Sequence, residues 1–60
     1  MQVFQLISLK QYILLVFYTR NSNYQFSIIN PNGFVYQPKD IFDTQQRAEK
    51  EGRLAIQFAS

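Results

Sequence analysis

The chain contains no cysteine and no histidine among its 60 residues. The first absence excludes disulfides, and the two together argue against a zinc site, because zinc is bound mainly by thiolate and imidazole groups. A domain of this length buries only about 60% of the surface of its unfolded chain, so its stability is marginal without support. The supports that remain are self-association and very close packing. We therefore expect one domain, residues 1–60, that pairs with a second copy.

Acidic residues are absent from residues 1–39, where the only charges are Lys10, Arg20 and Lys39. Residues 40–60 carry four acids and three bases, and the whole chain has a net charge of +2. Three scattered cations are few for a nucleic-acid-binding protein, which typically gathers Lys and Arg on one face. A solvated rim is the more ordinary interpretation of these charges.

Catalytic residues are also scarce. General acid–base catalysis usually recruits histidine or paired carboxylates. The acid pairs here are Asp40 with Asp43, in a connecting segment, and Glu49 with Glu51, which point to different sides of a helix. Neither a cysteine nucleophile nor a Gly-rich phosphate loop is present. We therefore expect no enzyme, no cofactor, no metal site and no small-molecule substrate.

Residues 24–36, YQFSIINPNGFVY, predict a β-hairpin. Pro31 suits the second position of a turn, and Gly33 suits a position of positive φ, as in a type I turn closed by a glycine bulge. Pairing Asn30 with Phe34 across this turn places Ile28 opposite Tyr36. One face of the hairpin is then mainly aromatic and comprises Tyr24, Phe26, Ile28, Phe34 and Tyr36.

Residues 12–18, YILLVFY, are apolar on both faces and rich in strand-favouring side chains, which predicts a central strand. Residues 1–10 fit an edge strand, a short helix or an extended arm. A strand that is apolar on both faces must be covered on both, and one helix covers only one of them. The other face must be covered by residues 1–10 or by a second subunit.

Residues 1–18 are too polar for a membrane helix and lack the order of a signal peptide, so we expect a cytoplasmic protein.

A helix is predicted for residues 43–58, after Pro38 ends the hairpin strand near Gln37 and residues 39–42 connect onward, as a possible short strand. Either Asp43, with Gln46 three residues later, or Thr44 can cap it. Its inner stripe is Ala48, Gly52, Ala55, Ile56 and Ala59. A glycine inside a helix costs about 1 kcal/mol relative to alanine. Gly52 is therefore expected to contact a bulky side chain, with Phe26 and Tyr36 as candidates.

These elements define an α+β fold with an antiparallel three-stranded meander over residues 12–37, a possible fourth strand or arm at residues 1–11, and one C-terminal helix packed on one face. Their order and motifs resemble the bacterial YegP-like family of small domains over residues 12–57. The motifs are Tyr24-x-Phe26-x-Ile28, Asn32-Gly33-x-Val35, Phe42-x-Thr44 and Ala48-x-x-x-Gly52-x-x-x-Ile56.

The resemblance implies a module of unassigned activity that pairs with another copy, and it carries no catalytic residues over. This chain departs from the family pattern at Pro31, at Gln25 in place of a cation, and in residues 1–11, which have no counterpart.

The expected function is a non-catalytic protein-interaction module that forms a homodimer or binds another protein. Neutral β-branched and amide side chains suit a protein interface better than a phosphate backbone. The candidate interface residues are Ile13, Leu15, Phe17, Ile29 and Val35. The alternative is single-stranded nucleic-acid binding, because aromatic side chains interleaved with cations can stack bases. Its candidate contacts are Lys10, Arg20, Lys39, Tyr12 and Tyr18.

Overall fold

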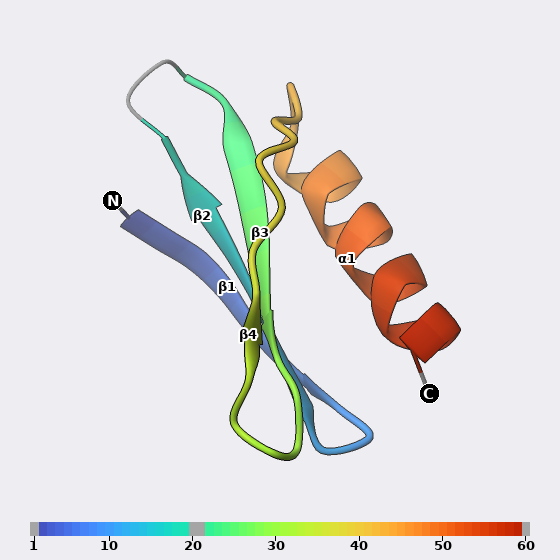
Figure 1. Cartoon of the computed structure of the whole chain (residues 1–60). Helices are drawn as coiled ribbons and strands as arrows, with labels where there is room; N and C mark the ends of the chain where they lie inside the picture. Colours follow the sequence, from blue (N-terminus) through green and yellow to red (C-terminus); the bar gives the residue numbers. More distant parts are fainter. Residues whose placement is uncertain (1, 20–21, 60) are drawn as a thin grey trace.

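The structure is a computed structural model that describes residues 2–19 and 22–59, the side chains of residues 2–5 excepted. Four antiparallel strands form one sheet in the order β1-β2-β3-β4, and a single helix lies on one side of it (Figure 1). The elements are β1 (Gln2–Leu9), β2 (Tyr12–Tyr18), β3 (Tyr24–Ile29), β4 (Val35–Tyr36) and α1 (Gln45–Ala59). The α+β meander predicted from the sequence is confirmed, with a fourth strand at its N-terminal side.

The N-terminal segment forms the edge strand β1, one of the three alternatives that the sequence left open. It pairs with β2 from Gln2↔Tyr18 to Leu9↔Tyr12, with an irregularity between Val3 and Gln5. A two-residue turn joins the strands, and both of its residues have positive φ, 50° at Lys10 and 70° at Gln11. These angles define a type I′ turn, whose twist matches that of the flanking strands.

The hairpin between β3 and β4 follows the predicted register, with Ile28 opposite Tyr36. The Asn30 N–H donates to the Phe34 carbonyl and the Gly33 N–H donates to the Asn30 carbonyl, both at 2.9 Å. The Asn30 side-chain oxygen accepts from the Phe34 N–H at 2.9 Å. Gly33 has a φ of 89°, a conformation that costs other residues more. Local chemistry therefore determines this turn.

The segment after β4 forms no further strand among the described residues. Its contact with the sheet is an isolated bridge between Phe42 and Tyr24, in which each N–H donates to the other carbonyl at 2.8 Å. The Phe42 ring also stacks on Phe26, with centroids 6.0 Å apart. Phe42 thus fixes the connection that leads into α1.

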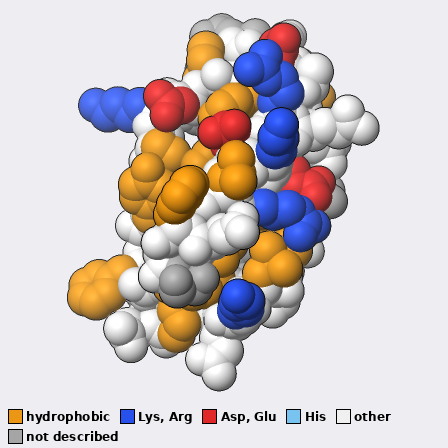
Figure 2. All heavy atoms as spheres, turned by 90° about the vertical axis from the view of Figure 1, so that its right-hand side faces the viewer, with side chains coloured by type: hydrophobic (Ala, Val, Ile, Leu, Met, Phe, Trp, Pro, Cys, Tyr) orange, Lys and Arg blue, Asp and Glu red, His pale blue; other side chains and the backbone are white. Residues whose placement is uncertain are grey.

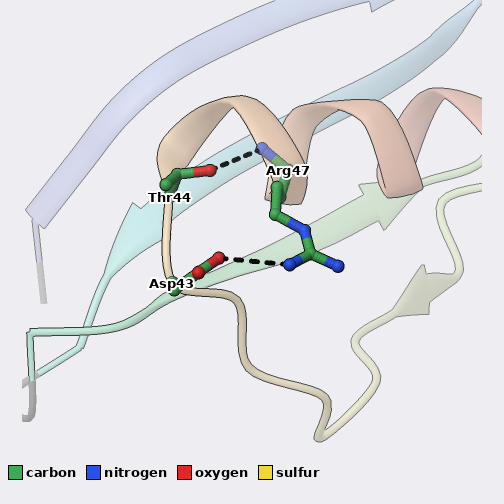
Figure 3. A network of polar contacts seen from close by, with 3 residues as sticks. All are labelled: Asp43, Thr44 and Arg47. Atoms are coloured by element: carbon green, nitrogen blue, oxygen red, sulfur yellow. Dashed lines mark hydrogen bonds and ion pairs between the residues drawn. The ribbon is translucent and has the colours of Figure 1, made fainter.

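The cap of α1 is Thr44, whose Oγ1 accepts a hydrogen bond from the Arg47 N–H at 3.1 Å (Figure 3). Asp43, the other candidate, instead lies beside the Arg47 guanidinium, with 3.6 Å between Oδ1 and Nη1. Both side chains of this ion pair are about 70% exposed, so the pair adds at most about 1 kcal/mol to stability. The helix therefore begins at Gln45, two residues later than predicted.

The core lies between α1 and one face of β2 and β3. Its buried apolar residues are Leu14, Val16, Phe26, Ile28, Ala48 and Ile56. Gly52 is buried where the helix approaches the sheet, and a β-carbon at this position would overlap the Leu14 side chain. The close approach predicted at Gly52 is thus present, but the expected aromatic partners were wrong. A branched aliphatic side chain of the central strand fills the space.

Replacing Gly52 with leucine is expected to lower the free energy of unfolding by about 1–3 kcal/mol or more, because the new side chain would overlap the fully buried Leu14 and overpack the core. The matched control is Lys50→Leu on the exposed side of the same helix, where a change within about 0.5 kcal/mol is expected. Urea unfolding followed by circular dichroism at one protein concentration measures both. Equal effects of the two substitutions would contradict the assigned packing.

The double variant Lys10→Asn/Gln11→Gly is expected to stabilise the chain. Positive φ costs a non-glycine residue roughly 1–2 kcal/mol, and Asn-Gly is the preferred type I′ pair. We expect a gain of about 1 kcal/mol in unfolding free energy, measured by the same urea titration. The comparison variant Lys10→Ala/Gln11→Ala should not be stabilised, since alanine has no preference for this conformation.

Candidate interaction surface

No helix packs on the face of the sheet opposite α1 among the described residues (Figure 1). Strand pairing places Ile13 beside Ile29 and Ile29 beside Val35, and it places Leu6 beside Leu15. We call these five residues, Leu6, Ile13, Leu15, Ile29 and Val35, the helix-free face. They extend across all four strands, from β1 at one edge to β4 at the other.

Exposure is greatest at the two edges of the helix-free face. Leu6 is 66% exposed and Val35 is 62% exposed, whereas Ile13, Leu15 and Ile29 are partly shielded by their neighbours in the sheet. The polar positions between them are neutral, and the Ser27 hydroxyl donates to the Gln37 side-chain oxygen at 2.7 Å. A neutral apolar face of this kind is typical of the centre of a protein interface.

Four of the five predicted interface residues belong to the helix-free face. The fifth, Phe17, is only 4% exposed. Its side chain therefore offers almost no surface to a partner, which corrects the sequence prediction at this position. Leu6 was missed because residues 1–10 had no assigned structure. The register that places it is set by the turn at Lys10 and Gln11, and the sequence carries no signal for that turn, because neither residue favours positive φ.

The alternative nucleic-acid residues are not brought together. Lys10 lies in the β1–β2 turn. The Lys39 carbonyl accepts from the Gln25 side-chain amide at 3.5 Å, and Gln25 pairs with Phe17 near the other end of β2. Tyr12, which follows the Lys10 turn, and Phe17 are five residues apart on β2, and this spacing corresponds to about 17 Å along the strand. The two candidate lysines therefore do not form one basic patch, and Arg20 lies outside the described residues.

The two candidate tyrosines of this alternative lie on the helix side of the sheet. Tyr12 packs against the core, and the Tyr18 ring meets Tyr24 edge to face at a centroid distance of 5.2 Å. On the same side of the molecule, basic and acidic side chains alternate (Figure 2). Arg53 bonds Glu49 at 2.7 Å, for example. This mixture does not form the open, basic, aromatic platform that base stacking requires.

A second apolar surface lies between the C-terminal half of α1 and the β3–β4 hairpin. It is a groove of about 630 Å³. Phe34 and Phe58 line this groove and are 72% and 87% exposed. The small side chains of Ala55 and Ala59 also line it and fill little of its volume. Val35 lines this groove as well, so the groove adjoins the β4 end of the helix-free face.

The described residues contain no group of three acidic side chains that could hold a metal ion. Their single helix is too short and too polar to cross a membrane. No protein-family model, curated protein or solved structure matches the chain significantly. The resemblance to YegP-like domains therefore stays a prediction.

Proposed function

We propose that this chain is a non-catalytic protein-interaction module that self-associates through the helix-free face. The observation that carries the proposal is the position of β1. It lies beside β2 in the same sheet and does not fold over the sheet. Strand β2 is apolar on both faces, and the face opposite α1 could be covered either by the N-terminal segment or by a second subunit. Because the N-terminal segment pairs with β2 at the edge of the sheet, a second subunit is the remaining candidate.

A second copy suits this face because the face carries no charge that would repel its own image. Two sheets packed face to face lie about 10 Å apart, with their side chains interdigitating. A two-fold axis would set the same residues of both copies against each other, as in most homodimers. A small adaptor or inhibitor that uses this face on another protein belongs to the same functional class.

The expected affinity is modest. Fully burying an aliphatic side chain contributes about 1.5–3 kcal/mol, so covering the exposed parts of Leu6 and Val35 in both copies contributes roughly 4–8 kcal/mol. The half-buried Ile13, Leu15 and Ile29 add to this sum. A Kd of about 1 µM corresponds to about 8 kcal/mol, and association also loses translational freedom. We therefore expect self-association in the micromolar range.

Sedimentation of the chain at micromolar concentrations is expected to give at least twice the chain mass of 7.1 kDa. The double variant Leu15→Lys/Val35→Lys should halve the observed mass at the same concentration, because two charges per copy would be buried without partners. Neither substitution lies on the edge strand β1. Circular dichroism should show the same secondary structure.

The control for this variant is Phe58→Lys, which removes a more exposed apolar side chain from α1. It should leave the mass unchanged, since Phe58 lies outside the helix-free face. A folded monomer at all concentrations in the unsubstituted chain would refute self-association. An equal loss of mass in both variants would indicate general hydrophobic association.

A further inference from the structure

The two edges of the sheet differ in how well they are protected. At one edge, β4 has only two residues and is followed closely by Pro38 and Lys39. Short length, proline and lysine are the usual means of preventing edge-to-edge pairing. At the other edge, β1 has eight residues with no charge, no proline and no glycine. Its one protective feature is the irregularity between Val3 and Gln5.

The ladder shows which backbone groups β1 presents outward. Residues flanking a two-residue turn form a hydrogen-bonded pair, and such pairs then alternate with pairs that are not hydrogen-bonded. From Leu9↔Tyr12, this alternation makes Ser8↔Ile13 and Leu6↔Leu15 non-hydrogen-bonded pairs. The N–H and C=O groups of Ser8 and Leu6 therefore point away from β2.

The hydrogen bonds at the opposite side of the sheet give the same result. The Asn30 N–H donates to the Phe34 carbonyl, so these two residues form a hydrogen-bonded pair. The next pair, Ile29 with Val35, is therefore not hydrogen-bonded, so the backbone groups of Ile29 point toward Ile13 on β2. The backbone groups of Ile13 then point toward β3, and those of its β1 partner Ser8 point outward. The outer edge of β1 thus offers two N–H and two C=O groups in the regular part of the strand, after the irregularity.

We infer that the outer edge of β1 binds the same edge of a second copy, antiparallel and centred on Ile7. In this register, Leu6 of each copy pairs with Ser8 of the other and exchanges two hydrogen bonds with it. A centre at Leu6 would instead require residue 4, at the irregularity. The inference rests on the proposed self-association and adds to it a contact separate from the helix-free face.

Charge and space both allow this pairing. The uncharged strands do not repel each other, and the antiparallel arrangement places Lys10 of one copy opposite residue 4 of the other. The two lysines are then about 20 Å apart, well beyond the screening length. Because α1 lies over β2 and β3, the two helices would be four strand spacings apart. This separation of about 19 Å exceeds a helix diameter of about 10–12 Å.

Amide hydrogen exchange of the intact chain tests this pairing directly. The Ile7 N–H points toward β2 and should be protected at every concentration at which the chain is folded. The Leu6 and Ser8 N–H groups should be slowed at least about tenfold at high concentration and lose this protection on dilution. If both exchange freely in a chain that sediments as a dimer, the edge inference is wrong while the helix-free face remains a possible interface.

The substitutions Ser8→Pro and Ser8→Val separate the backbone contact from the side chain. Both place an apolar group on the same face, but only proline removes the outward N–H, a change that edge strands tolerate. Ser8→Pro should abolish the protection of Leu6 and halve the sedimenting mass, whereas Ser8→Val should do neither. If Ser8→Pro does not fold, the exchange of Leu6 in the unsubstituted chain decides the question.

The register can be tested by cysteine crosslinking, because the chain has no cysteine of its own. In the inferred register, residue 7 faces residue 7 of the second copy at a Cα separation of about 4.5 Å, which is within the range of a disulfide. Ile7→Cys should therefore oxidise to a covalent dimer. Leu9→Cys should not, since its two copies would be about 13 Å apart. Equal crosslinking of both variants would overturn the register.

Discussion

One helix can cover only one face of a sheet, and this limit governs the rest of the molecule. Helix α1 closes over β2 and β3 because Gly52 lets it approach the fully buried Leu14. No second helix covers the opposite face, since the other described residues form strands, turns and connecting segments. The same contact that gives the domain its core therefore leaves the opposite, apolar face without a helix.

The elements with local chemical signals were the ones predictable from the sequence. The turn at residues 30–33 has proline and glycine in the required positions, and the hairpin register followed from it. The turn at Lys10 and Gln11 has no such signal, since neither residue favours positive φ. Its formation is explained by tertiary context. Without β1, the doubly apolar β2 would itself be an exposed edge of the sheet.

The candidate surface was predictable in its composition and less so in its detail. Alternation along β2 and β3 correctly grouped Ile13, Leu15 and Ile29 on one face. It could not show that Phe17, on the same strand, is buried, because burial depends on how strongly the sheet twists and on what lies over it. Sequence spacing likewise identified Gly52 as a close contact but not Leu14 as its partner, since periodicity gives the face of a helix and not its position over the sheet.

An uncharged face and an uncharged edge would together be a liability in a chain that stayed alone, because both invite irregular aggregation. The two-fold pairing inferred above would remove this hazard at the edge. It would use the outward N–H and C=O groups of Leu6 and Ser8 once each, whereas the far edge at β4 is protected by its shortness and by Pro38. The asymmetry between the edges is thus what an assembly limited to a few copies requires. A chain with two unprotected edges would continue to add copies without end.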